Sequence, residues 1–425
     1  MRICFIQYQG NMLSGGQGVY LHYLTRELAR MGHEVHVIAG LPYPEVTEDV
    51  HIHKLKTFSF WSLLDGYQEY VYHTHPLLYF HPVNLYEFAS TRVNLTSLLN
   101  MFSLRAYYKL NELEQERPFD LIHDNQTLGY GIWLMKKLRG RPVVANIHHP
   151  LAIDRLNELR QARSLGKLVS RLIWFPWVMQ SWVARRVDRI ITGSASSADS
   201  IVQFFGLPRE HIRVIYDGID PDVFVRPEGV EPEPNRVLFV GHTEDKNKGF
   251  RYLLEALRLL RGRVPYHLVV VQRPRSNEAP RLVEEMGLQG RVSYFEKLTT
   301  AELIRTYSRA QLLVSPSLYE GFGLPAAEAM ACGTPVVATT AGALREIVED
   351  GVSGLTVPPG DAVALSQAIE MMLSDPERCR RAGAAGARRM RERFTWHSTA
   401  EETMALYEEV LGRRRLADQP VSARL

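Results

Sequence analysis

Two glutamates, Glu320 and Glu328, flank a glycine turn and the start of an expected helix. Ionised carboxylates only accept hydrogen bonds, so the hydroxyl groups of a ribose or a hexose are natural donors to them. Pro325 suits the first turn of a helix, and Gly321 and Gly323 before it leave backbone N–H groups free for a phosphate. Two solvated surface carboxylates are the alternative interpretation, but the glycines and the proline favour a ligand site.

The elements around this turn are predicted to follow the order strand, turn, helix, strand. Residues 311–314 form a short apolar run that suits a buried parallel strand, and open α/β sheets bind ligands beyond the carboxyl ends of such strands. Residues 326–330 are expected to be helical, residues 333–335 end the helix, and residues 336–338 form the next strand.

The complete motif runs Glu320-Gly-Phe-Gly-Leu-Pro-x-x-Glu328-Ala-Met-Ala-x-Gly-x-Pro-Val-Val. It resembles the signature of the family 4 retaining glycosyltransferases of GT-B architecture, also called glycosyltransferase group 1. The likeness covers nearly the whole chain and is strongest over residues 236–410 and weakest over residues 41–117. It implies an α/β fold of the GT-B type, in which two Rossmann-like α/β/α domains face each other across a cleft.

The resemblance also implies roles for individual residues. The implied catalytic residues are His148, Lys248 and Glu320. The implied donor-binding residues are Gly16, His242, Lys248, Glu320, Gly321, Phe322, Gly323, Leu324 and Glu328. Lys248 would bind the donor diphosphate, Glu320 the hydroxyl groups of the donor sugar, and Glu328 the ribose. Because the family has an arginine at the position of His242, the second cation of the diphosphate clamp stays open, with Lys246 as the alternative.

Residues in the amino-terminal half add two candidate positions. Gly16 and Gly18 lie in a turn between an expected strand and helix, but Leu21 stands where a dinucleotide fingerprint needs its third glycine. The resemblance places Gly16 under the donor diphosphate, and a plain turn glycine is the alternative. His148 follows an expected strand and would face the donor sugar and the acceptor, whereas a structural histidine is the alternative there. His123 and Asp124 are weaker candidates.

Composition limits the class of protein. The 425 residues are too many for one compact core and suggest two domains of about 200 residues each. A net charge of +3 is too small to indicate a nucleic-acid partner. The three cysteines are widely spaced, which excludes a disulfide framework and a cysteine-rich zinc site, and a cytoplasmic location is expected. Asp220-Pro-Asp222 has the Asp-x-Asp pattern of a metal site, but it falls in a turn, and we assign no metal and no cofactor.

The chain is expected to divide into three parts. Residues 1–225 would form an acceptor-binding domain, residues 226–395 a donor-binding domain, and residues 396–425 a helix that crosses back to the first domain, with a tail. The aromatic-rich residues 41–117 are interpreted as an acceptor-side insertion. Residues 165–186 are basic and aromatic, which fits either an interfacial helix on an anionic membrane surface or an ordinary helix over the sheet.

The resulting functional hypothesis is a metal-independent, retaining glycosyltransferase. It would move a hexose from a UDP- or GDP-sugar to the hydroxyl group of an unidentified acceptor, in the synthesis of a glycan, a glycolipid or a glycosylated metabolite. A nucleotide-sugar epimerase of similar two-domain architecture is one alternative. An inactive nucleotide-sugar-binding relative is another, because His242 and Gln272 depart from the family pattern.

Overall fold

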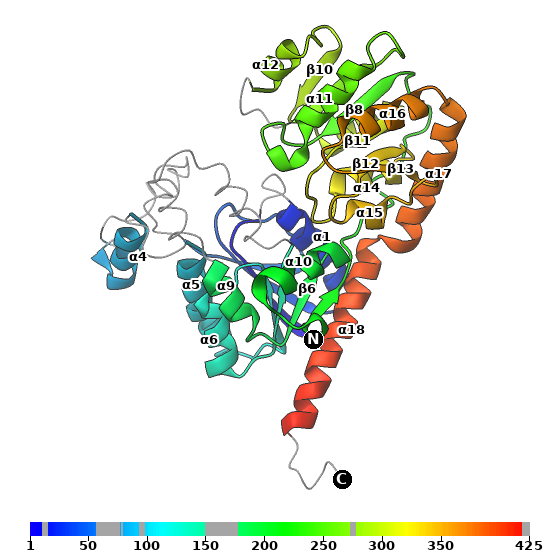
Figure 1. Cartoon of the computed structure of the whole chain (residues 1–425). Helices are drawn as coiled ribbons and strands as arrows, with labels where there is room; N and C mark the ends of the chain where they lie inside the picture. The colour runs from blue at the N-terminus through cyan, green and yellow to red at the C-terminus, as the bar shows by residue number, and fades with distance from the viewer. Residues whose placement is uncertain are drawn as a thin grey trace. The chain divides into compact units, whose positions relative to one another are not determined.

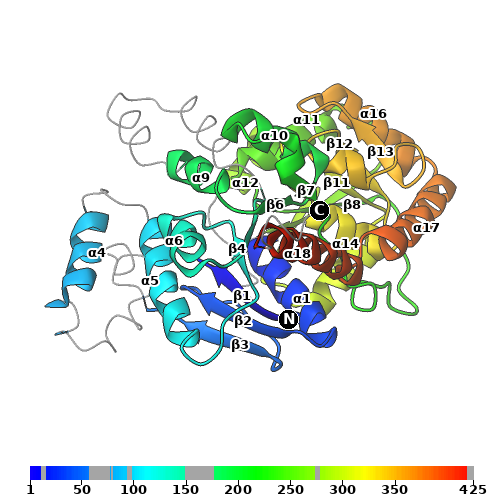
Figure 2. The same ribbon diagram turned by 90° about the horizontal axis from the view of Figure 1, so that it is seen from below.

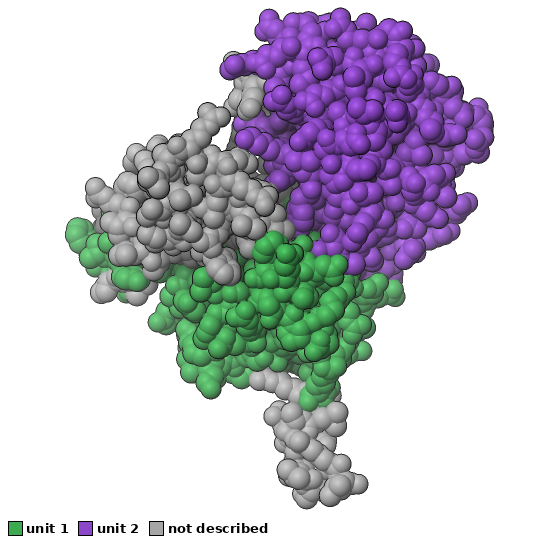
Figure 3. All heavy atoms as spheres, viewed as in Figure 1, with its two compact units in different colours: residues 1–192, 197–215, 400–425 green, residues 193–196, 216–399 purple. Residues whose placement is uncertain are grey.

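The computed structural model describes residues 1–10, 16–56, 77, 80–92, 98–148, 177–272 and 278–418. Contacts within the chain divide it into two compact units, which Figure 3 shows in different colours. Unit 1 consists of Met1–Thr192, Ser197–Ile215 and Ala400–Leu425, and unit 2 of Gly193–Ser196 and Tyr216–Thr399. Each unit is described by itself below.

Unit 1 is built on a parallel sheet with the strand order β3-β2-β1-β4-β5-β6-β7. The strands are β1 (Arg2–Gln7), β2 (Glu34–Ala39), β3 (Val50–Lys54), β4 (Leu121–Asn125), β5 (Val143–Asn146), β6 (Arg189–Thr192) and β7 (Ile212–Val214). Strand order reverses between β1 and β4, which is the place where doubly wound sheets bind ligands beyond the carboxyl ends of the strands.

Helices cover both faces of this sheet (Figures 1 and 2). They are α1 (Gly16–Arg30), α5 (Leu98–Leu113), α6 (Tyr130–Arg139), α9 (Trp177–Ala184), α10 (Ala195–Phe205) and α18 (Trp396–Asp418). Helix α4 (Pro82–Arg92) stands away from the sheet and is joined to α5 by the ion pair of Glu87 with Arg105. Successive side chains of a strand point to opposite faces. Accordingly Ile122 of β4 packs in the core under α5 and α6, while the next residue, His123, contacts Tyr407 of α18.

Unit 2 has a second parallel sheet, with the strand order β10-β9-β8-β11-β12-β13. Its strands are β8 (Arg236–Val240), β9 (His267–Gln272), β10 (Val292–Glu296), β11 (Leu312–Ser315), β12 (Val336–Thr339) and β13 (Gly354–Val357). Its helices are α11 (Phe250–Leu259), α12 (Glu278–Glu285), α13 (Thr300–Arg309), α14 (Leu324–Ala331), α15 (Leu344–Ile347), α16 (Ala362–Leu373) and α17 (Pro376–Arg393). Two buried clusters, one on each face of the sheet, hold these helices in place.

The predicted α/β architecture is confirmed, and so is the order of strand, turn, helix and strand around the glycine turn. Strand β11, helix α14 with Pro325 in its first turn, and strand β12 follow one another in the expected places. Strand β3 was not predicted, because it lies within residues 41–117, which were interpreted as an acceptor-side insertion. Strand β3 alternates apolar and histidine residues, and it is defined by its pairing with β2, where the rings of His36 and His53 are hydrogen-bonded at 2.9 Å.

Glycine is required where the loop after β8 touches the loop after β11. Gly249 has φ +66°, and a Cβ atom there would lie 2.0 Å from the carbonyl oxygen of Pro316. We therefore expect Gly249→Ala to lower the free energy of unfolding by about 3 kcal/mol or more, from backbone strain plus a clash. Gly262 is a matched control, because it has φ +77° and nothing within 4 Å.

Gly262→Ala should lose only about 1 kcal/mol, from the left-handed conformation alone. Urea unfolding of both variants measures the difference. Equal losses in the two variants would show that the close approach to Pro316 contributes nothing.

Candidate active site

The centre of the site in unit 2 is an ion pair between Lys248 and Glu320. Lys248 ends a short 3₁₀ turn after β8, and Glu320 lies in the loop after β11, at the carboxyl ends of neighbouring strands. The Nζ atom of Lys248 lies 3.0 Å from Oε1 and 2.9 Å from Oε2 of Glu320. One ammonium group thus donates to both carboxylate oxygens, and the two predicted catalytic residues are in direct contact.

Glu320 is held by its neighbours as well as by Lys248. Ser317 Oγ donates to Glu320 Oε2 at 3.1 Å, and the carbonyl oxygen of Glu320 accepts from the backbone N–H of Ala343 at 3.1 Å. At Gly342, with φ +57°, a Cβ atom would lie 1.9 Å from that same carbonyl oxygen. The carboxylate is therefore fixed in position before any ligand arrives.

The ion pair also fixes the charge of Lys248. Burial alone lowers the pKa of this ammonium group, but the charge of Glu320, its hydrogen bonds and the charge of Asp245 raise it, and the net pKa lies above its ordinary value of 10.5. Lys248 is thus a cation throughout the physiological pH range. An ammonium group has three N–H donors, so one remains after both oxygens of Glu320 are bound, and a phosphate oxygen is a suitable acceptor for it.

The amino end of helix α14 adds a partial positive charge beside the Lys248–Glu320 ion pair. Gly323 caps the helix with φ +99°, and Leu324 begins it. Pro325 has no N–H group, and the N–H groups of Ala326 and Ala327 donate to the carbonyl oxygen of Gly323, so the first turn presents the N–H of Leu324 and the positive end of the helix dipole. Gly321 is half-buried in the preceding turn. The side chain of Phe322 is 5% exposed and packs against Phe394 at 6.1 Å between ring centroids, which makes the ring part of the core.

Glu328 lies one turn into α14 and has a partner that the sequence did not suggest. The hydroxyl group of Tyr307, a buried residue of α13, donates to Glu328 Oε2 at 2.6 Å. Burial raises the pKa of Glu328 to about 7, and the hydrogen bond from Tyr307 lowers it in part. The carboxyl group of Glu328 therefore changes its charge near neutral pH.

His242, which stands where the family has an arginine, lies in the turn after β8. His242 is half-buried there, and its carbonyl oxygen accepts from the N–H of Asp245 at 3.2 Å. Gln272, at the end of β9, accepts a hydrogen bond from Thr243 Oγ1 at 2.5 Å. Lys246 is exposed in the 3₁₀ turn, so a second cation stands in the same loop as Lys248.

Unit 1 carries a separate polar cluster around His148. The Nε2 atom of His148 lies 2.9 Å from Asn125 Oδ1, and its backbone N–H donates to Gln126 Oε1 at 2.8 Å. Asn125 Nδ2 in turn donates to Gln7 Oε1 at 2.5 Å. Tyr20 of α1 packs edge-on against the His148 ring at 5.0 Å between centroids. These contacts tie His148 to the carboxyl ends of β1 and β4.

Sequence reasoning missed most of this cluster. Asn125 was not among the predicted site residues, yet it is 1% exposed and hydrogen-bonded. A usable signal was the polar run at the end of an otherwise apolar strand, which also contains Gln126 in a left-handed conformation at φ 62°. Non-glycine residues in that conformation are uncommon and occur often at functional sites.

The two weaker candidates of β4 are core residues. His123 is fully buried, stacks on Phe5 at 4.6 Å and contacts the hydroxyl group of Tyr407, and burial lowers its pKa to about 3. Asp124 accepts hydrogen bonds from the N–H groups of Leu128 and Thr127 at 2.7 and 3.3 Å, and burial raises its pKa to about 7. The Asp124 carboxyl group thereby holds the turn that follows β4, whereas His123 packs between Phe5 and Tyr407.

Gly16 opens helix α1, directly after residues 11–15, which lie outside the described residues. The carbonyl oxygen of the next residue, Gln17, accepts from Asn125 Nδ2 at 3.3 Å, so the first turn of α1 adjoins the His148 cluster. Asp220 of the Asp-x-Asp pattern accepts from the N–H of Asp222 at 3.1 Å and thereby closes its own turn. Within the described ranges, no group of metal-ligating side chains is arranged to hold an ion.

Only the last part of the basic, aromatic segment 165–186 is described. In it, Trp182 of α9 packs edge-on against Trp133 at 5.3 Å, and the guanidinium group of Arg186 lies 3.7 Å above the Trp182 ring. These side chains serve packing within unit 1. None of the described helices combines the length and the apolar run needed to cross a bilayer, and membrane contact stays a prediction.

Comparison with known proteins gives consistent matches along the chain. Residues 222–389 match the family described as glycosyl transferases group 1, and residues 14–223 match glycosyltransferase family 4. The MMP alpha-(1->4)-mannosyltransferase of Mycolicibacterium hassiacum is 37% identical over 97% of this chain and 99% of its own length. The glycogen synthase of Mycobacterium tuberculosis is 28% identical over 96% of this chain and 94% of its own length.

Solved structures agree with these matches. Sucrose-phosphate synthase from Thermosynechococcus elongatus has a TM-score of 0.71 and 25% identity, and the match covers 97% of this chain and all of that one (100%). The HepE protein of Anabaena in complex with UDP-glucose has a TM-score of 0.66 and 18% identity, covering 96% of this chain and 99% of that one. The GT-B fold expected from the sequence is confirmed by these likenesses.

Glu328 should make stability depend on pH. Its pKa is raised from 4.5 to about 7, so between these values the folded protein binds more protons than the unfolded chain, and the free energy of unfolding falls as pH rises. Glu328→Gln removes this ionisation while keeping an acceptor for Tyr307. We expect the fall in unfolding free energy between pH 5 and pH 8 to shrink by about 1–2 kcal/mol, allowing for partial solvent exposure.

Urea unfolding of the wild type and the variant at both pH values measures this change. Asp124 and Asp217, whose pKa values burial raises to about 7, remain in both proteins, so part of the slope should survive. An unchanged slope in Glu328→Gln would show that the Glu328 carboxyl group ionises alike in the folded and unfolded protein.

Proposed function

This chain belongs to the group 1, family 4 glycosyltransferases, and from that membership we propose that it transfers a sugar from a nucleotide-diphosphate sugar to an acceptor hydroxyl group, with retention of the anomeric configuration. The single observation that carries the proposal is the contact of Lys248 with both oxygens of Glu320, beside the amino end of α14. A cation, a helix end and a carboxylate stand together there, as a diphosphate joined to a sugar requires.

The diphosphate of the donor binds the positively charged groups of the site, Lys248 and the amino end of α14. As the bond between the anomeric carbon and the phosphate oxygen breaks, negative charge accumulates on the leaving diphosphate. The remaining N–H of Lys248, the N–H of Leu324 and the positive end of the α14 dipole are already in place for that charge. This fixed positive charge supports a reaction that requires no metal ion, so we propose that transfer continues in a chelator such as EDTA.

Glu320 and Glu328 accept hydrogen bonds from the hydroxyl groups of the donor. Glu320 is fixed by Lys248 and Ser317, and its carboxylate accepts from hydroxyl groups of the donor sugar. Glu328 accepts from the ribose, which requires its ionised form. Because Tyr307 holds one oxygen of Glu328, the other is left to the ligand, and the direction of the carboxylate is set before binding.

The acceptor belongs with the cluster of His148 and Asn125. In the proposed reaction a bond forms between the acceptor oxygen and the anomeric carbon, on the face from which the diphosphate departs. The acceptor proton passes to the leaving phosphate oxygen, so no protein base is consumed. His148 would orient the acceptor hydroxyl group, with its own ring oriented by Asn125.

The identity of the donor sugar is suggested only by the name of a related enzyme. Mannose is the first sugar to test, because the relative at 37% identity is named as a mannosyltransferase, and UDP and GDP are the first nucleotides. We propose a cytoplasmic enzyme whose acceptor leads to a glycan, a glycolipid or a glycosylated metabolite.

Removing either member of the ion pair should abolish transfer. With GDP-mannose, UDP-glucose and ADP-glucose offered to an acceptor panel, we expect the active combination to lose at least about 100-fold in kcat/KM in Lys248→Ala and in Glu320→Gln, because each variant removes a charge used in the transition state. Arg251→Ala is the control, since Arg251 is an exposed cation of unit 2 that pairs with Glu255 on its own helix.

Mass spectrometry identifies the product, and the coupling constant of its anomeric proton reports the stereochemistry. Inversion of configuration would refute retention. Full activity in both variants would refute the proposed site, and conversion of the donor without an acceptor would identify an epimerase.

Donor use should depend on pH through Glu328. Because the carboxyl group must be ionised to accept from the ribose, kcat/KM for the donor should rise with pH through an apparent pKa of about 7. Tyr307→Phe removes a hydrogen bond that lowers this pKa, so the rising limb should move to higher pH, with a larger change in KM than in kcat.

A pH profile of both proteins tests this expectation. Thr306→Val is a matched control, because it removes another hydroxyl group from α13, one that donates to the carbonyl oxygen of Glu302. A limb that stays in place in Tyr307→Phe would show that the phenol does not act through Glu328.

A further inference from the structure

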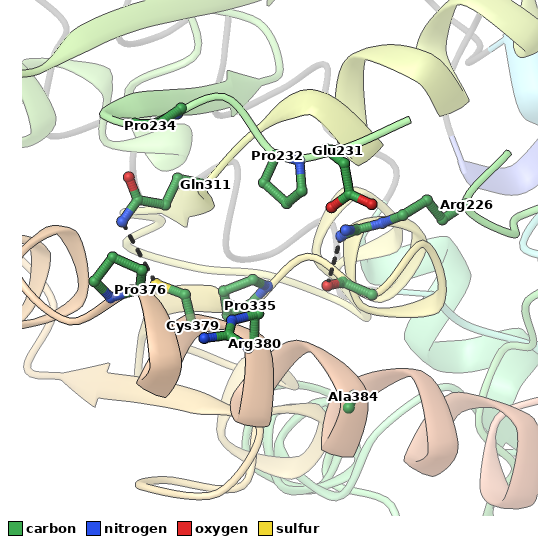
Figure 4. A pocket seen from close by; sticks show the side chains of 11 residues that line it. Arg226, Glu231, Pro232, Pro234, Gln311, Pro335, Pro376, Cys379, Arg380 and Ala384 are labelled. Carbon is green, nitrogen blue, oxygen red and sulfur yellow. Dashed lines mark hydrogen bonds between the residues drawn. The ribbon is translucent and has the colours of Figure 1, made fainter. Parts of the chain in front are cut away.

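A second pocket in unit 2 lies away from the proposed donor site (Figure 4). It has a volume of about 420 Å³, within the range typical of small-molecule sites. Its walls come from the segment before β8, the residues just before β11 and β12, and the first turns of α17. Gln311 precedes β11 and Pro335 precedes β12, so the pocket stands at the amino ends of these strands, whereas Lys248 and Glu320 stand beyond the carboxyl ends.

The pocket walls are apolar and poor in backbone donors. Four prolines line it, and proline has no N–H group; they are Pro232, Pro234, Pro335 and Pro376. Gln311, on the same wall, already uses its amide, since Oε1 accepts from the N–H of Asn235 at 2.6 Å and Nε2 donates to the carbonyl oxygen of Leu373 at 3.2 Å. A ligand therefore meets apolar surface over most of its area.

Two guanidinium groups are the exceptions. Arg226 is half-buried and donates through Nε to the carbonyl oxygen of Cys332 at 3.2 Å and through Nη2 to that of Gly333 at 2.9 Å. Figure 4 shows it at the side of the pocket where Glu231 also lies. Burial lowers the pKa of the Arg226 guanidinium group below its ordinary value, and the nearby charge of Glu231 offsets this effect only in part.

Arg380 is the second cation, on the wall formed by α17. It is paired with Glu377 one turn earlier on the same helix, and its side chain is 72% exposed. Glu231 contributes one negative charge to the lining, against the two positive charges of Arg226 and Arg380. The net charge of the lining is therefore positive, and its charged donors are concentrated in these two arginines.

From this juxtaposition of two arginines with a proline-walled cavity we propose that the pocket binds a small organic anion, an apolar or aromatic body that carries one carboxylate or phosphate group. The anionic group binds the guanidinium groups, which accommodate oxyanions well, and the body packs against the proline rings. The site lies at the amino ends of the strands, apart from the donor site at their carboxyl ends.

Ligand-observed NMR with three probes of similar shape tests the proposal. Phenyl phosphate and 3-phenylpropionate carry the two kinds of anionic group, and 3-phenylpropanamide is neutral. We expect at least one of the anions to bind, and the amide to bind at least about fivefold more weakly. Arg380→Gln should weaken binding of the anion about threefold or more, as expected for a partly exposed charge.

Two further variants separate this pocket from the rest of the surface. Ala384 lines the pocket and is exposed, so Ala384→Phe should fill the space without disturbing the core and should abolish binding. Arg381→Gln is the matched control, because Arg381 is the next residue, is 66% exposed and also pairs with Glu377, but does not line the pocket. It should bind the anion as the wild type does.

The donor site also attracts anions, so Lys248→Ala is included and should keep the binding. Loss of binding in Lys248→Ala with retention in Ala384→Phe would place the anion at the donor site and overturn the proposal. Equal binding of the neutral amide, or no binding of either anion at millimolar concentration, would also overturn it.

Discussion

The arrangement of unit 2 around its proposed site depends on one half-buried ion pair. Lys248 and Glu320 come from loops after different strands, and their contact at 2.9–3.0 Å fixes both loops together. A charge left unpaired in such a place is costly, so each residue stabilises the fold as well as the charge of the other. The backbone is shaped for this contact: Gly249 and Gly342 each leave room for a carbonyl group at a distance where no other residue fits.

The parts of the fold that the sequence predicted are those that local patterns encode. Short apolar runs identified the strands before and after the glycine turn, because strands buried on both faces read as continuous hydrophobic segments. Pro325 marked the first turn of α14 because its missing N–H is not needed there. The importance of Lys248 and Glu320 came from the family resemblance, and their proximity follows from β8 and β11 being neighbours in the sheet.

The parts that were not predicted depend on contacts between distant segments. No local pattern shows that Tyr307 reaches Glu328, or that Gln7 and Asn125 meet beside His148, because each pair joins residues far apart in the chain. The same holds for β3, whose histidines become a strand only by pairing with β2. Phe322 shows that membership of a motif does not place a side chain in the site. It lies inside the motif, yet its ring is buried in the core, so only its backbone is available to a ligand.

Helix α14 connects the two ends of unit 2 that carry its candidate sites. Its amino end stands beside Glu320 and its first turns carry Glu328, while the carbonyl groups just past its carboxyl end are held by Arg226, which lines the second pocket. The cation of Arg226 at that end complements the helix dipole, so an anion bound to Arg226 would reduce this support. Arg226 thus has two roles that the structure shows directly: it binds the carbonyl groups just past the carboxyl end of α14, and it lines the second pocket.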